Sequence, residues 1–83
     1  MIMEIMNKVT PADVRAARQA LKSAGIAATV RRKLARFLRV RTSELMDILP
    51  VLDALEALGF RPEYRQNPIQ DGDQFYFTKG KSP

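Results

Sequence analysis

The 83 residues contain neither cysteine nor histidine, so disulfides and the usual structural zinc sites cannot help to hold this chain together. The fold must come from one apolar core, which is modest in a chain of this size. A 46% share of apolar residues beside 28% charged ones is typical of a soluble globular protein. The same absences exclude cysteine nucleophiles and histidine-based dyads or triads. We therefore expect one domain over residues 1–83, with no enzyme activity, metal or other cofactor.

Positive charge is concentrated in the first half of the chain. Residues 1–41 carry ten basic side chains and two acidic ones, a net charge of +8, whereas residues 42–83 carry four basic and seven acidic ones, a net charge of −3. No acidic residue lies between Asp13 and Glu44. Such a half attracts polyanions over roughly a Debye length, about 8–10 Å at physiological salt. The candidate partners are nucleic acid, an anionic membrane and an acidic protein surface.

Membrane segments are not predicted. Residues 1–6 are apolar, but Glu4 interrupts them and no basic stretch precedes them, so they lack the pattern of a signal peptide. No other stretch approaches the roughly 18 uncharged apolar residues that a spanning helix needs. These features predict a cytoplasmic protein without a membrane partner, and one associated with the nucleoid if it binds DNA.

The first predicted helix covers residues 11–24. Thr10 can cap it, Pro11 suits its first position, where no N–H is needed, and Asp13 stands three residues after the cap. Apolar residues then recur at helical spacing until Gly25 ends the pattern. The opposite side of this helix carries a stripe of cations: Arg15, Arg18 and Lys22.

A second helix is predicted over residues 27–40. Its apolar stripe is formed by Val30, Leu34, Phe37 and Leu38. Its other side and flanks carry only cations: Arg31, Arg32, Lys33, Arg36, Arg39 and Arg41. Like charges at helical spacing are destabilising, and solvated faces usually mix signs. Because five of the six cations are arginine, which pairs with phosphate and carboxylate through its fork of donors, the face is interpreted as a polyanion-binding surface.

A third helical stretch is predicted over residues 43–58, with a kink or break near 46–50. Pro50 would cost about 3 kcal/mol deep inside a helix. In an alternative, residues 43–46 form a short turn of helix and Asp47 caps a new helix, which places Pro50 harmlessly in its first turn. The exposed positions of this stretch are acidic: Asp47, Asp53 and Glu56.

After Gly59 the pattern changes to strands, and a hairpin is predicted over residues 60–79 with a loop at about 67–73. Pro62 predicts that the first strand is an edge strand or begins after it. Residues 1–6 could add a short strand beside the hairpin, and residues 80–83 are expected to form a frayed tail. The predicted fold class is α+β and mostly α: three helices followed by a C-terminal β-hairpin.

This element order resembles that of winged helix-turn-helix domains. The resemblance covers residues 45–79 and is carried by the phrases LDALEALGF at 52–60 and DGDQFYFT at 71–78. It implies that the third helix enters the major groove and that the hairpin, the wing, touches phosphate or the minor groove. Here, however, that helix presents Asp53 and Glu56, and the wing loop contains Asp71 and Asp73, all of which phosphates repel. Either the basic second helix contacts nucleic acid or the scaffold binds protein.

The sequence thus favours a small DNA-binding protein, a transcriptional regulator, whose phosphate contacts come from the second helix with the stripe of the first as an adjoining patch. The alternative is a modulator, an inhibitor or adaptor such as a mobile element could encode, that docks on an acidic protein surface. The hairpin aromatics (Tyr64, Phe75, Tyr76 and Phe77) are expected to pack rather than to stack on bases. The carboxylates Glu63, Asp71 and Asp73 lack the count and spacing of a calcium loop. Whether the chain forms a homodimer stays open.

Overall fold

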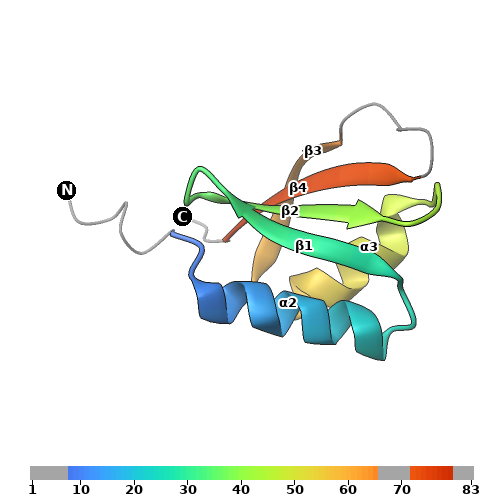
Figure 1. Ribbon diagram of the computed structural model, residues 1–83, viewed down its shortest axis with the longest axis horizontal. Helices are drawn as coiled ribbons and strands as arrows, with labels where there is room; N and C mark the ends of the chain where they lie inside the picture. The colour runs from blue at the N-terminus through green and yellow to red at the C-terminus, as the bar shows by residue number, and fades with distance from the viewer. Residues whose placement is uncertain (1–7, 66–71, 80–83) are drawn as a thin grey trace.

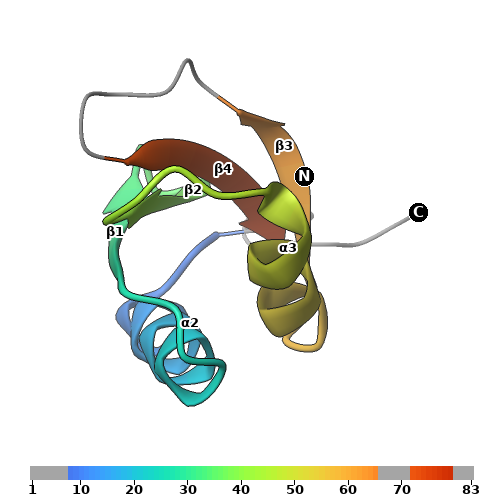
Figure 2. The same cartoon turned by 90° about the vertical axis from the view of Figure 1, so that its right-hand side faces the viewer.

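The computed structural model describes residues 8–65 and 72–79, which form a two-layer α/β sandwich. All four strands belong to one antiparallel sheet in the order β1-β2-β4-β3. The two helices of the described residues lie on the same side of this sheet (Figures 1 and 2). The mostly helical fold predicted from the sequence, three helices and a hairpin, is therefore wrong. In chain order the elements are α2 (Pro11–Ser23), β1 (Ala28–Lys33), β2 (Phe37–Thr42), α3 (Ile48–Glu56), β3 (Phe60–Arg65) and β4 (Asp73–Lys79).

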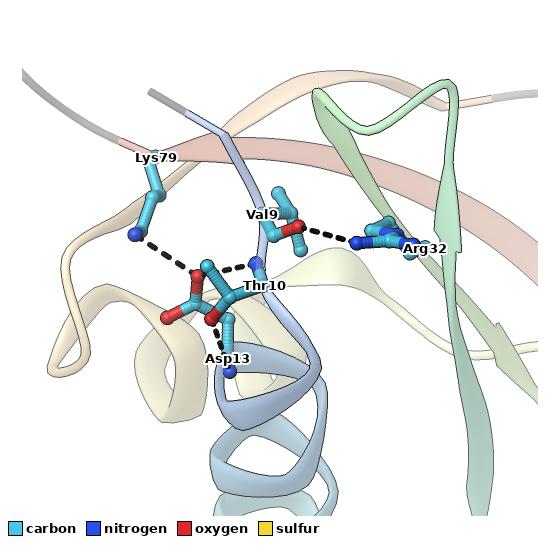
Figure 3. A network of polar contacts seen from close by, with 5 residues as sticks. All are labelled: Val9, Thr10, Asp13, Arg32 and Lys79. Atoms are coloured by element: carbon cyan, nitrogen blue, oxygen red, sulfur yellow. Dashed lines mark hydrogen bonds and ion pairs between the residues drawn. The ribbon is translucent and has the colours of Figure 1, made fainter. Parts of the chain in front are cut away.

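Helix α2 confirms the first predicted helix and its start. The Thr10 hydroxyl accepts a hydrogen bond from the Asp13 N–H at 3.2 Å, and the Asp13 carboxylate accepts one from the Thr10 N–H at 2.8 Å. The same carboxylate lies 2.9 Å from the Lys79 ammonium, which ties the start of α2 to β4 (Figure 3). Burial raises the pKa of Asp13, but the hydrogen bonds from Thr10 and the ion pair with Lys79 outweigh it and hold this pKa below its ordinary value.

The second predicted helix, over 27–40, is wrong, because this segment forms the β1–β2 hairpin. Its inward side chains alternate as strand positions do: Val30 on β1, and Leu38 and Val40 on β2, are all buried. Leu34, which the helical interpretation placed in the core, is instead 75% exposed at the turn. Local helix propensity did not decide the structure of this segment, because pairing of β2 with the distant strand β4 stabilises the hairpin.

The third predicted helix is shorter than expected. Helix α3 begins after Asp47, so Pro50 lies in the first turn as the alternative interpretation proposed, and residues 43–47 are not helical. Asp47 makes no side-chain capping hydrogen bond. Val51 and Leu55 are buried against the sheet, whereas Leu49 is 61% exposed. Because no helix precedes Ile48 after β2, the helical stretch predicted over 43–58 with a kink or break near 46–50 is wrong, and only its later part forms a helix.

The C-terminal hairpin is confirmed as β3 paired with β4. Strand β3 is an edge of the sheet, as Pro62 predicted, and its register shifts between Pro62 and Tyr64. The short strand considered for residues 1–6, most of the loop at 67–73 and the tail at 80–83 lie outside the described residues. Neither of the two described helices is long and apolar enough to cross a membrane. The core between helices and sheet is formed by Val9, Ala17, Leu21, Val30, Leu38, Val40, Val51, Leu55, Phe60, Phe75 and Phe77.

Candidate functional site

One face of the sheet is covered by α2 and α3, and no helix of the described residues lies on the other (Figure 2). Because side chains alternate along a strand, the register of the ladders decides which residues share this second face. We call it the helix-free face. Its side chains in the described strands are Thr29, Arg31 and Lys33 from β1, Phe37, Arg39 and Arg41 from β2, Arg61 from β3, and Gln74, Tyr76 and Thr78 from β4.

Five of these ten side chains are cations, and two of them face each other. Arg31 on β1 stands directly opposite Arg39 on β2, which brings their Cβ atoms to about 4.5–5.5 Å. Arg31 is exposed and Arg39 is partly exposed. Among the described residues neither has an ion-pair partner, and none of the ten face positions is acidic. Like charges directly opposite each other destabilise a sheet, so this pair opposes folding.

An aromatic pair lies beside the arginines. The rings of Phe37 and Tyr76 meet edge to face, with centroids 6.1 Å apart and an angle of 85° between their planes. The Lys33 ammonium lies 5.7 Å from the Tyr76 ring centroid, in reach of a cation–π interaction. Tyr76 is only 3% exposed, whereas Phe37 is partly exposed. Phe75 and Phe77 point into the core, which agrees with the packing role predicted for them.

The nine cations predicted as a site are divided between two sides of the sheet. Arg31, Lys33, Arg39 and Arg41 share the helix-free face, together with Arg61, which the sequence interpretation missed. Arg61 is assigned to this face because it pairs with Thr78. No local sequence motif predicts that pairing.

Two of the predicted cations bind backbone oxygens instead. The Arg32 guanidinium donates to the Val9 oxygen at 3.3 Å, and the Arg18 guanidinium to the Val30 oxygen at 3.1 Å (Figure 3 shows the first). Val30 lies on the edge strand β1, so Arg18 reaches round that edge from α2. Arg15 and Lys22 share its side of the helix by their spacing and are exposed. Positive charge therefore continues from the helix-free face round the β1 edge to α2, and Arg36 stands exposed in the β1–β2 turn.

Neither β1 nor β2 contains an acidic residue. Asp53 and Glu56 are exposed on α3, in the layer behind the sheet, as the sequence predicted for this helix. In residues 8–65 and 72–79 no cluster of three or more acidic side chains could hold a metal ion. The acidic side chains of α3 therefore lie behind the sheet, and the exposed Glu63 lies on β3, the edge strand farthest from β1.

A hollow of about 360 Å³ lies at the end of the β1–β2 hairpin away from its turn. It is lined by Ala28, Thr29, Arg41, Thr42 and Ser43. The Ser43 hydroxyl donates to the Ala27 oxygen at 3.0 Å. The guanidinium of Arg41 and the Thr29 hydroxyl, which stand opposite each other, are the groups here that can bind an anion.

The site is thus a basic sheet face bordered by a basic edge strand, with an aromatic pair among its cations. In comparisons with known proteins, no protein-family model, no curated protein and no solved structure matches this chain.

Proposed function

We propose that this chain binds nucleic acid through its helix-free face, with the phosphates held by Arg31, Lys33, Arg39 and Arg41. The observation that carries the proposal is the cross-strand pair of Arg31 and Arg39, exposed to different degrees and neutralised by no described carboxylate. The sheet bears a repulsion that a single glutamate at either position would remove. A polyanion that binds across both strands removes it as well.

The shape of the basic surface favours a duplex. Strands β1 and β2 form a two-stranded ribbon at one edge of the sheet, closed by a short turn, and DNA-binding proteins place such strands in the major or the minor groove. Alternate residues along a strand repeat every 6.5–7 Å or so, so Arg39 and Arg41 present their forks at two successive positions. The ribbon takes the place of the basic helix that the sequence predicted, and regulation of transcription is one use for such binding.

Fluorescence anisotropy with labelled duplex DNA, single-stranded DNA and RNA tests this proposal directly. Binding to duplex is expected at about 50 mM salt and should weaken as salt rises, with a log–log slope near −4 if most of the five face cations meet phosphates. Arg41→Gln should weaken binding and reduce the slope magnitude by about 0.9.

The matched control is Leu49→Glu, which lowers the net charge of +5 by one, as Arg41→Gln does. Leu49 is exposed on α3, behind the sheet, so this variant should bind as the wild type does. Absence of binding to every nucleic acid at low salt would refute the proposal, as would equal losses in the two variants. Nuclease-resistant capture of one acidic protein by a chain that binds no nucleic acid would support the protein-binding alternative.

A further inference from the structure

The turn between β1 and β2 combines strain with an exposed apolar side chain. Leu34 and Ala35 have φ angles of +56° and +61°, a left-handed conformation that residues other than glycine, asparagine and aspartate seldom adopt. Two successive positive φ angles are typical of a type I′ turn, for which Asn-Gly is the favoured sequence. Leu34 is 75% exposed. Neither the strain nor the exposed leucine stabilises the fold, since asparagine and glycine in the turn would remove both.

The strained turn is held rigidly. The Arg36 N–H closes it by donating to the Lys33 oxygen at 3.3 Å, and the Val9 N–H donates to the Ala35 oxygen at 2.9 Å. Arg32 donates to the oxygen of the same Val9 (Figure 3). The segment before α2 therefore braces the tip of the hairpin. Leu34 therefore projects from a turn that hydrogen bonds tie to the segment before α2.

The surroundings of Leu34 indicate what it could enter. Lys33 and Arg36 flank the turn, and both are exposed. An apolar side chain with a cation on either side suits a binding site that has an apolar interior and negative charges around it. Stacked base pairs between phosphates have this combination, and leucine is one of the side chains that proteins insert between base steps from the minor groove.

We propose that Leu34 is a wedge that inserts between two base pairs of duplex DNA while the cations beside the turn hold the flanking phosphates. This inference rests on the proposed function and adds to it a deformation of the DNA. The backbone strain has a role in this insertion, because the left-handed conformation places the Leu34 side chain at the tip of the hairpin. Flexible pyrimidine–purine steps should be the preferred insertion points, since they open most easily.

The test uses the full chain and a duplex of about 20 base pairs with a central pyrimidine–purine step. The purine of that step is 2-aminopurine, which fluoresces more strongly when unstacked, and a donor and acceptor dye at the two ends report bending. Anisotropy on the same duplex sets protein concentrations at saturation. The wild type is expected to raise the 2-aminopurine signal and to shorten the end-to-end distance.

Leu34→Asn is the decisive variant because asparagine fits a type I′ turn. It should melt at the same temperature as the wild type or higher, should still bind duplex, and should lose both the fluorescence rise and the bend. Leu34→Met, which keeps an apolar wedge, should retain them.

A saturated wild-type complex without either signal would overturn the wedge and leave nucleic-acid binding intact, as would a Leu34→Asn complex with unchanged signals. Absence of any anisotropy change would refute the proposed function itself, and the wedge with it. The two failures are therefore distinguished by the same titration.

Discussion

Arg31→Glu should make the protein more stable while it weakens binding. In the wild type Arg31 faces Arg39 across the β1–β2 ladder without a described counter-ion. The substitution turns this repulsion into an attraction. Arg31 is exposed on an edge strand, so little packing is lost. A stabilising change that damages function is the mark of a residue kept for its ligand rather than for the fold.

The magnitude follows from the geometry. Two unit charges about 6 Å apart in water interact by about 0.7 kcal/mol, and screening at 0.15 M salt reduces this to about 0.3 kcal/mol. Reversing one sign changes the energy by twice that amount, about 0.7 kcal/mol at 0.15 M salt and about 1.1 kcal/mol at 0.01 M. For a domain of this size, about 0.7 kcal/mol raises the melting temperature by roughly 3–5 °C.

A double-mutant cycle measures the coupling. Arg31→Glu and Arg39→Glu should each stabilise the fold, by thermal or urea unfolding, whereas the double variant should return toward the wild type because two glutamates again repel. Duplex affinity should follow a different order: each single variant binds more weakly, and the double variant most weakly. Strictly additive stabilities would show that the two side chains do not interact. If either single variant binds duplex DNA as tightly as the wild type, the helix-free face does not take part in binding.

Three further predictions concern the fold. Ala35→Gly should raise the free energy of unfolding by about 0.5–1 kcal/mol, because glycine relieves a φ of +61° at a smaller loss in chain entropy; a lower urea midpoint would contradict the strain. Gly72→Ala should lower it by about 1–3 kcal/mol, since the new Cβ would overlap the Thr42 backbone oxygen; an unchanged melting temperature would disprove this close approach. Asp13→Asn should destabilise at neutral pH by about 0.5–1 kcal/mol through the loss of the capping box and the Lys79 ion pair. Because the folded pKa of Asp13 is lowered, this difference should persist above about pH 4 and disappear as the pH falls further; a difference independent of pH would show that the charge contributes nothing.

The elements that could be predicted are those with local signals. Thr10, Pro11 and Asp13 specify the start of α2 within four residues, and the structure contains the capping box they imply. Pro50 restricts α3 to a start at which its missing N–H is harmless. The alternating pattern after Gly59 predicted β3 and β4 because a strand leaves its period in the sequence.

The β1–β2 hairpin could not be predicted in the same way. Its turn contains Leu34 and Ala35, two good helix formers, where a hairpin signal would be asparagine or glycine. The run of arginine and lysine around it fits a helix face as well as a strand. Stabilisation comes from β4, more than thirty residues further along the chain. Four of the five cations on the helix-free face were among the residues predicted from the sequence, but their grouping by a helical period placed Arg32 and Arg36 beside Arg39, whereas the strand period places Arg31 there.

The register of the ladder explains why the arginine repulsion cannot relax. Directly next to the Arg31–Arg39 pair, Val30 faces Val40, and Val40 in turn faces Phe75, all three buried on the other side of the sheet. A slip by one residue would bury the arginines and expose the valines, which costs far more than the repulsion it relieves. The core thus fixes the arginines at close range before any ligand arrives. A polyanion that binds across both strands meets arginines whose backbone positions are already fixed, so less of its binding energy is lost in bringing them together.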